Sequence, residues 1–576
     1  MPDDKQQGLY RGLTHYGDIE FSRYLRRSFA RSMGYSGEEL NRPIIGIADS
    51  GSGFNNCHRH FPELIESVKR GVLAAGALPI TFPTISLGEP FLHPTSMMFR
   101  NLMSMDVEEM VRAQPMDGVV LVGGCDKTVP AQLMGAFSAG RPAIQLVGGP
   151  MMTGRYEGER LGACTDCRRH WSNFRGGDLS VTQIEEIEGQ LATTAGTCAV
   201  MGTASTMACI AEALGMMLPK SATIPAVHAD RLRAAEATGR QAVWLAQQKL
   251  TPDQIVTEKS VENALRVLLA IGGSTNGLIH LTAMAGRLGI DISPQRLNAL
   301  AETTPVLVNL KPSGTHYMED FHAAGGLPAV MKQIKDLLHL DCLTVTGKTL
   351  GEELDGSRPW FDKNIVRERS DPVHEKGGLL ALFGSLAPNG ALIKCAAADE
   401  RLFEHEGRAV VFDTLEDMAE RLDSPDLDVR ADDVLVLRNA GPRAAAMPES
   451  GYIPIPSKLA LQGVRDMVRI SDARMSGTAY GTVVLHISPE ASLGGPLALV
   501  RDGDRIRLSV SAQRLDLLVD EDELARRRAQ FESKAQKPSR GYEWLYQKHV
   551  LQAEHGCDFD FLRRCGVDTD SEETEK

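Results

Sequence analysis

The first 150 residues contain three short apolar runs, each followed by a glycine-containing loop, and stretches with helical spacing lie between the runs. The apolar runs cover residues 43–48, 118–122 and 143–147, and each is only five or six residues long. Short apolar strands that alternate with helices are typical of a parallel β-sheet covered by helices on its faces. We therefore expect the chain to begin with an α/β domain.

The composition of the sequence changes at residues 366–378, which are polar and rich in turn formers. Beyond this expected linker, apolar runs with strand character dominate, and Arg501-Asp-Gly-Asp504 between two of them indicates a hairpin turn. We expect two domains, an α/β domain at 1–377 and a β-rich, barrel-like domain at 378–576. The acidic tail from Asp568 to Lys576 is expected to be disordered. The expected strands of the second domain are 409–412, 434–437, 482–487, 497–500, 505–510 and 515–519.

Charge and composition exclude several classes of function. The chain has 62 basic and 75 acidic residues, a net charge of −13, so it repels polyanions and nucleic acid is not an expected partner. No apolar run approaches the roughly 18 residues that span a bilayer, and no membrane partner is expected. The N-terminus is polar rather than signal-like, so we expect a cytoplasmic protein. Ten cysteines in 576 residues do not form a disulfide framework.

Three cysteines share one kind of position. Cys57 and Cys125 each follow an expected strand through a glycine-containing loop, and Cys198 precedes an expected helix at 199–218. Loops at the carboxyl ends of parallel strands gather at one edge of the sheet, and helix N-termini favour thiolates. Three thiolates would hold an iron–sulfur cluster and leave one iron position open, which suits a hydro-lyase. Ordinary buried cysteines are the alternative.

A second group of residues offers oxygen ligands. Glu89, Asp126 and Glu449 lie in loops or beside Cys125, and Lys127 follows Asp126. Carboxylates in such positions suit Mg²⁺, whereas a lysine could bind a metal only as a carbamate or after deprotonation. Taken singly, Glu89 and Glu449 are better explained as solvated loop acids, whereas Asp126 is the stronger candidate because it adjoins Cys125.

A serine in the segment 470–481 is the candidate base. Ser476 is followed by Gly477 and Thr478, without the Gly-x-Ser-x-Gly spacing of a hydrolase. An alkoxide base there would need a metal charge nearby, and a turn serine is the simpler alternative.

Weaker candidates lie elsewhere in the first domain. Cys164-x-x-Cys167-x-x-His170 could form a zinc or redox site, although it lacks a second ligand pair and is better explained as a solvent loop. His58 and His60 flank Cys57, and local structure is the favoured explanation for both. The loop 272–276 opens a helix that is expected to run to residue 288, either as an anion site or as a simple cap.

Four ordered motifs resemble the dihydroxy-acid dehydratase / phosphogluconate dehydratase family, and the resemblance extends over residues 40 to 550. The motifs are GCDK at 124–127, TCAVMGTASTM at 197–207, IGGSTN at 271–276 and DARMSGT at 472–478. The stretches at 94–103 and 476–486 look most like the sugar-acid branch, the L-arabinonate and D-xylonate dehydratases.

The resemblance implies roles for individual residues. Cys57, Cys125 and Cys198 match the iron–sulfur ligands, and the sugar-acid branch implies a [2Fe–2S] cluster where relatives carry [4Fe–4S]. Ser476 matches the alkoxide base, with Thr478 near the substrate. The Mg²⁺ ligands are matched by Glu89, Asp126 and Glu449, together with Lys127 as a carbamate. The implied assembly is a homodimer or homotetramer.

Two departures from the family pattern concern the substrate rather than the reaction. Asn56-Cys57-His58 stands where Pro-Cys-Asn is common, and residues 441–449 lack the usual glycines.

The expected reaction is dehydration of a sugar acid to its 2-keto-3-deoxy acid. The nearest alternative is a branched-chain dihydroxy-acid dehydratase acting on 2,3-dihydroxyisovalerate. Alternatives of other classes are a zinc hydrolase and a non-catalytic iron–sulfur sensor.

Overall fold

A computed structural model describes residues 7–13, 17–357, 360–533 and 538–564. The chain divides into two units. Unit 1 consists of residues 1–164, 188–271 and 307–373, and unit 2 of residues 165–187, 272–306 and 374–576. The expected disordered tail from Asp568 to Lys576 lies outside the described residues.

Unit 1 contains a four-stranded parallel sheet in the order β2-β1-β3-β4. Its strands are β1 (Ile44–Asp49), β2 (Leu78–Pro83), β3 (Gly118–Gly123) and β4 (Ala143–Val147). The α/β prediction is therefore confirmed, and β1, β3 and β4 are the three expected strands. β2 was not expected because its sequence contains Pro79 and Pro83. Proline lacks the N–H that a central strand needs, and β2 lies at the sheet edge, where that loss is tolerated.

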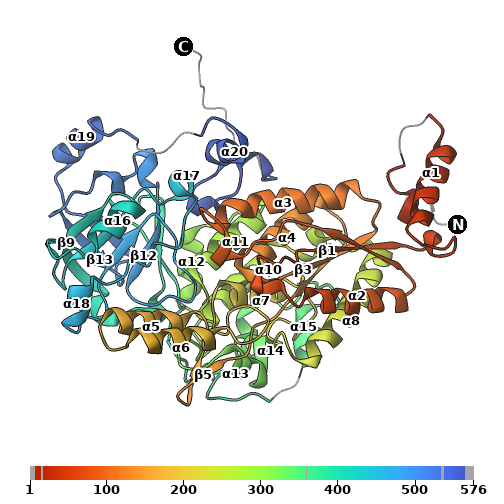
Figure 1. Ribbon diagram of the computed structural model, residues 1–576, viewed down its shortest axis with the longest axis horizontal. Coiled ribbons are helices and arrows are strands. Elements are labelled where there is room, and N and C mark those ends of the chain that lie inside the picture. The colour runs from red at the N-terminus through yellow and green to blue at the C-terminus, as the bar shows by residue number, and fades with distance from the viewer. Residues whose placement is uncertain (1–6, 14–16, 358–359, 534–537, 565–576) are drawn as a thin grey trace, which may run out of the picture. The chain divides into compact units, whose positions relative to one another are not determined.

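Helices cover both faces of this sheet (Figure 1). α2 (Phe61–Ala74) and α8 (Ala229–Gln248) lie below it in that view, and α3 (Ser96–Ala113) and α4 (Cys125–Ala139) lie above it. α2 and α8 pack closely because Gly71 has no side chain: a Cβ there would lie 2.0 Å from the carbonyl oxygen of Glu236. The residues of β3 and β4 and nearly all of those of β1 are thus buried, which explains the mainly apolar sequences of these three strands.

One helix boundary differs from expectation. α7 (Thr203–Ala213) is shorter than the expected 199–218. α4 begins at Cys125 and contains Pro130 in its interior. The other elements of unit 1 include α1 (Ile19–Ser32), β5 (Gly154–Tyr156), β6 (Glu159–Leu161), α9 (Pro252–Ile255), α10 (Glu258–Ala270), α13 (Met318–Ala323), α14 (Gly326–Gln333) and α15 (Leu350–Asp355).

Unit 2 contains an eight-stranded sheet in the order β14-β13-β9-β10-β11-β12-β8-β7. Its edge strands β7 and β14 are joined by a bridge between Phe383 and Arg514, in which Leu515 N donates to Phe383 O at 2.8 Å. The sheet therefore comes close to a barrel, as expected. The strands are β7 (Leu380–Leu382), β8 (Gly390–Ile393), β9 (Glu404–Phe412), β10 (Val434–Leu437), β11 (Arg469–Ser471), β12 (Val483–Ser488), β13 (Arg505–Ser509) and β14 (Arg514–Leu517).

The segment 497–500 was expected as a strand, but residues 497–499 lie in a 3-10 helix, η10 (Pro496–Leu499). The guanidinium of Arg438 donates to the carbonyl oxygens of Ala498 and Val500 at 2.8 and 2.7 Å. These carbonyls therefore need no partner strand. The turn at 501–504 precedes β13 without forming a hairpin, and the hairpin at this edge joins β13 to β14.

Helices surround the strands of unit 2. α11 (Thr275–Gly286) begins at Ser274, whose hydroxyl accepts from Asn276 N at 3.1 Å and caps the helix. The remaining helices of this unit include α5 (Thr165–Arg175), α12 (Pro294–Ala301), α16 (Leu415–Arg421), α17 (Pro442–Ala445), α18 (Ser457–Leu461), α19 (Glu521–Ala529) and α20 (Gly541–His549), while α6 (Val181–Leu191) crosses from unit 2 into unit 1. Among the described residues, no helix combines the length and the apolar character needed to cross a membrane.

Candidate functional site

The three predicted cysteine ligands meet in unit 1. Cys57 lies in η4 (Asn56–His58), Cys125 begins α4, and Cys198 lies in the loop before α7. The neighbouring Cys57 thiol and burial raise the pKa of Cys125 well above its usual value. The pKa of Cys198 is raised by the Cys164 thiol, by burial, and by Cys57 and Cys125. Thiols far apart in sequence thus share one cradle, in which Cys57 and Cys125 are buried and Cys198 is partly buried.

A fourth sulfur, that of Cys164, lies in the same cradle. Its Sγ is 3.7 Å from the Sγ of Cys198. This position of Cys164 corrects the solvent loop that was expected for residues 164–170. Cys167 and His170 lie on α5, which belongs to unit 2, whereas Cys164 belongs to unit 1. Spacing could not reveal Cys164 because 34 residues separate it from Cys198.

The loop that carries Cys57 is held by its own polar side chains. Asn55 Oδ1 accepts from Cys57 N at 3.2 Å, and His58 Nδ1 lies 2.7 Å from the carbonyl oxygen of Ser50. The His58 ring stacks on Phe61 with centroids 4.2 Å apart. Burial lowers the pKa of His58 to about 4, so its imidazole is neutral near pH 7. His58 therefore organises the loop, as expected.

Two backbone features fix the neighbourhood of these thiols. A Cβ on Gly88 would lie 2.6 Å from the carbonyl oxygen of Phe54, so the absent side chain lets the Glu89 loop approach the Cys57 loop. Cys125 has a φ of 58°, in the left-handed region that non-glycine residues rarely adopt. Strained backbone of this kind clusters at functional sites, where the surrounding structure maintains it.

The oxygen ligands divide between the two units. In unit 1 the ammonium of the buried Lys127 hydrogen-bonds Asp126 and lies 3.3 Å from Glu89 Oε2. A cation thus already sits between two carboxylates. In unit 2, Glu449 pairs with the buried Arg474 at 2.5 Å.

The candidate base lies on a loop of unit 2 that follows β11. Ser476 Oγ and Thr478 Oγ1 are 2.9 Å apart. The Asn276 side chain donates to Met475 O at 2.9 Å, which ties α11 to this loop. A bridge between Ser450 and Met475 places the segment of Glu449 beside that of Ser476.

A buried carboxylate holds the start of the same loop. Asp472 accepts from Ala440 N at 3.0 Å and from Ala491 N at 2.9 Å. Burial raises the pKa of Asp472 to about 6. Its interactions with backbone N–H groups identify Asp472 as a structural residue, a role that its place in the DARMSGT motif does not indicate.

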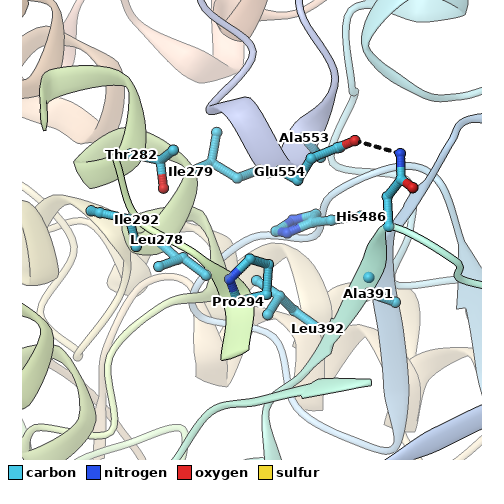
Figure 2. Close-up of a pocket in the computed structure, with 12 residues that line it drawn as sticks. Leu278, Ile279, Thr282, Ile292, Pro294, Ala391, Leu392, His486, Ala553 and Glu554 are labelled. Carbon is cyan, nitrogen blue, oxygen red and sulfur yellow. Dashed lines mark hydrogen bonds between the residues drawn. The ribbon is translucent and has the colours of Figure 1, made fainter. Parts of the chain in front are cut away.

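Figure 2 shows an apolar pocket of about 30 Å³ in unit 2, which none of the predicted site residues lines. The imidazole of His486 points into it, and Asn389 donates to Glu554 at its rim at 2.9 Å. The pocket has room for about one water molecule and is separate from the candidate site residues. Its walls are formed by Leu278, Ile279, Ile292, Pro294 and Leu392, among others.

Comparison with known proteins agrees with these features. Residues 42–353 match the family described as Dihydroxy-acid/6-phosphogluconate dehydratase N-terminal, and residues 364–557 match its C-terminal counterpart. The chain is 44% identical to an L-arabinonate dehydratase of Rhizobium leguminosarum over 96% of each chain. It is 46% identical to a 6-deoxy-6-sulfo-D-gluconate dehydratase of Pseudomonas putida over 94% of each chain.

A dihydroxy-acid dehydratase of Syntrophobacter fumaroxidans is 37% identical, over 92% of this chain and 96% of its own. The matches to the N- and C-terminal family regions together cover most of the sequence. The alignments with these three dehydratases cover nearly the whole length of both chains. The chain therefore belongs to the dihydroxy-acid/6-phosphogluconate dehydratase family, and it is a hydro-lyase.

Proposed function

We propose that this protein dehydrates a sugar acid, a pentonate such as L-arabinonate or D-xylonate, to its 2-keto-3-deoxy acid. The observation that carries the proposal is the clustering of the Cys57, Cys125 and Cys198 thiols in unit 1. Support for a sugar acid comes from the relatives, since an L-arabinonate dehydratase and a sulfogluconate dehydratase are 44% and 46% identical to this chain.

The cradle fits an iron–sulfur cluster, which members of this family use. Thiols are weak hydrogen-bond donors and acceptors, so a cluster of neighbouring thiols gives little stability to a protein core. The same cluster suits a soft metal, for which thiolates are good ligands. Cys57, Cys125 and Cys198 would hold the cluster, which we propose to be [2Fe–2S], with [4Fe–4S] as the alternative. When bound, it supplies a Lewis acid for the departing hydroxyl.

The oxygen ligands fit Mg²⁺, the second cofactor of the family. The Lys127 ammonium offsets one of the two negative charges of Glu89 and Asp126, and a carbamate on Lys127 would reverse its charge and make it a ligand. Glu89, Asp126, Glu449 and the modified Lys127 would hold the ion. When bound, Mg²⁺ supplies positive charge for the substrate carboxylate, which this acidic chain otherwise repels.

The residues of unit 2 would move the proton. Ser476, as an alkoxide, takes the proton from C2 of the substrate, and Thr478 orients the Ser476 oxygen through the 2.9 Å contact. The C2 proton and the C3 hydroxyl together leave as water. The resulting enol then tautomerises to the 2-keto-3-deoxy acid.

A substrate panel tests this function. Anaerobically purified, iron-replete protein is assayed for 2-keto acid formation with L-arabinonate, D-xylonate, 6-deoxy-6-sulfo-D-gluconate and 2,3-dihydroxyisovalerate. We expect kcat/KM to be highest for a pentonate. A higher value for 2,3-dihydroxyisovalerate would replace the proposal with the branched-chain reaction.

Metal analysis addresses the alternatives of other classes. Iron, acid-labile sulfide and magnesium are measured on the same protein. Zinc without iron or sulfide would favour a hydrolase. A cluster without turnover of any acid in the panel would favour an iron–sulfur sensor.

We also propose a cytoplasmic homo-oligomer, a dimer or a tetramer. Nine cysteines of the described chain are free thiols, which suits a reducing compartment. Exposed apolar side chains on α1, including Tyr24, Phe29 and Met33, offer surface for a second copy. Light scattering after size-exclusion chromatography measures the mass, and a monomer would contradict the proposed assembly.

A further inference from the structure

We propose that Cys164 is a fourth sulfur donor to the iron–sulfur cluster, and that it occupies the iron position left open by Cys57, Cys125 and Cys198 while no substrate is bound. This inference rests on the proposed function, because it concerns the same cluster. It assigns a role to a thiol that lies outside the family motifs of this chain.

The four sulfurs are arranged as two pairs. The Cys125 thiol interacts with the Cys57 thiol, and the Sγ of Cys198 lies 3.7 Å from the Sγ of Cys164. Full ligation of a [2Fe–2S] cluster needs four thiolates, two for each iron. The chain therefore offers the number and the grouping of sulfurs that such a cluster can use.

The spacing within the second pair agrees with shared ligation of one metal. Two thiolates on one tetrahedral metal, each about 2.3 Å from it, lie roughly 3.7–3.8 Å apart. The Sγ atoms of Cys164 and Cys198 are 3.7 Å apart. That separation is too long for a disulfide, in which the sulfurs are about 2.0 Å apart.

The backbone holds the two segments of this pair side by side. Ala199 N donates to Ala163 O at 3.2 Å, and Thr197 N donates to Gly149 O at 2.9 Å. Ala163 and Ala199 pack with Met151 in a small apolar cluster against which Cys164 lies. A backbone hydrogen bond and the apolar cluster of neighbouring residues therefore hold the two sulfurs close together.

The two members of the pair differ in their place in the sequence. Both thiols are partly buried, and buried residues follow each of them, 199–202 after Cys198 and 165–166 after Cys164. Cys198 lies in the TCAVMGTASTM motif at 197–207, whereas Cys164 lies outside the family motifs, so Cys164 is the member of the pair that we assign to give up its position. When the substrate hydroxyl takes that position, the iron–sulfur bond to Cys164 breaks, the thiolate takes a proton from solvent, and no electron is transferred.

Spectroscopy of the cluster-containing protein tests the role of Cys164. Wild type, Cys164→Ala and the control Cys395→Ala, which removes a partly buried thiol of unit 2, are purified anaerobically and reduced with dithionite. We expect the electron paramagnetic resonance g-values of Cys164→Ala to differ from those of wild type without substrate. With saturating L-arabinonate, or the acid that the panel identifies, the two spectra should coincide. Cys395→Ala should match wild type in both states.

Stability in air gives a second readout that does not depend on activity. An exposed iron reacts faster with oxygen, so we expect the half-life of the visible absorption to fall by about threefold or more in Cys164→Ala and to stay unchanged in Cys395→Ala. If Cys164→Ala retains no iron, Cys164→Ser replaces it, and its oxygen donor should still shift the g-values.

The outcomes separate the two proposals. Identical substrate-free g-values and half-lives in wild type and the Cys164 variant, with a cluster present and sugar acid dehydrated, would overturn the role of Cys164 alone. Wild-type protein that is folded but takes up no iron or sulfide would overturn the proposed function.

Discussion

At the scale of single residues, the proposed chemistry depends most on Ser476. We expect Ser476→Ala to lower kcat by about 10³-fold or more, since a positioned general base contributes roughly 10²–10⁴-fold. The visible absorption should not change, because Ser476 belongs to unit 2 and the four thiols belong to unit 1. Steady-state kinetics and absorption spectra of the same preparation measure both effects.

A matched control for Ser476→Ala is Ser511→Ala, which removes an exposed hydroxyl of the same unit. This variant should keep wild-type kcat. Retention of wild-type kcat by Ser476→Ala would remove the serine from the mechanism.

His486 makes a pH-dependent contribution to stability. Burial lowers its pKa to about 3, whereas an unfolded histidine titrates near 6.5. Between these values the unfolded chain binds one more proton than the folded chain, so the contribution of His486 is present above pH 6.5 and is lost as the pH falls. As the pH falls from 5.5 to 4, the free energy of unfolding of His486→Leu should therefore rise relative to that of wild type by about 1.4 kcal/mol per pH unit.

Urea unfolding at several pH values measures this difference. The exposed His555 provides the control, because His555→Leu should follow the wild-type pH dependence. Parallel pH profiles for His486→Leu and wild type would contradict a neutral, buried imidazole.

Single residues also mark the limit of the sequence reasoning. Cys57 and Cys125 could be foreseen as neighbours because each follows a strand of one parallel sheet, and such strand ends share an edge. Cys164 could not, because a backbone contact between two irregular segments brings it to Cys198. No periodicity encodes a contact of that kind.

At the scale of elements, the geometry of the cluster site depends on the close approach of the Glu89 loop to the Cys57 loop. Gly88→Ala would place a Cβ 2.6 Å from the carbonyl oxygen of Phe54, so the loop that carries Cys57 must move. We expect this variant to retain less than about half of the wild-type iron while keeping its far-UV circular dichroism. Gly53→Ala, on the same loop with nothing within 4 Å of the added atom, should retain all of it. Equal iron content in both variants would argue against the role of this contact.

Secondary structure was predictable where local pattern decides it and unpredictable where a tertiary contact decides it. Strands β1, β3 and β4 are apolar on both faces and end in glycine loops, which the sequence displays directly. The segment 497–500 has an equally apolar sequence, but Arg438 binds its carbonyl oxygens and it forms no strand. β2 escaped prediction because its prolines argue against any strand except one at an edge.

At the scale of the whole molecule, the two proposed metals should be separable. Treatment with EDTA should abolish turnover without changing the visible absorption, and added Mg²⁺ should restore it. The reason is that oxygen ligands exchange Mg²⁺ readily, whereas thiolates hold iron tightly. Full turnover after EDTA, with magnesium below about a tenth of an ion per chain, would contradict the proposed Mg²⁺ site.

The sequence shows one change in local pattern, from helical spacing to runs with strand character near residue 378, and it shows no other boundary. Residues 165–187 and 272–306 belong with the residues after 374, although their helical spacing resembles that of the surrounding chain. Membership of a unit is determined by long-range packing, such as the bond from Asn276 to Met475, and such contacts leave no local signature.

This interleaving has a consequence for synthesis on the ribosome. The polypeptide emerges from its amino end, so α5 and α11 leave the exit tunnel before their partners α18 and η11 (Ala553–His555) have been translated. The buried residues of α11 must wait, shielded by a chaperone or by transient burial, until the last third of the message is read. Premature termination near residue 374 would therefore release a nascent chain with two orphaned helical segments rather than a finished first half.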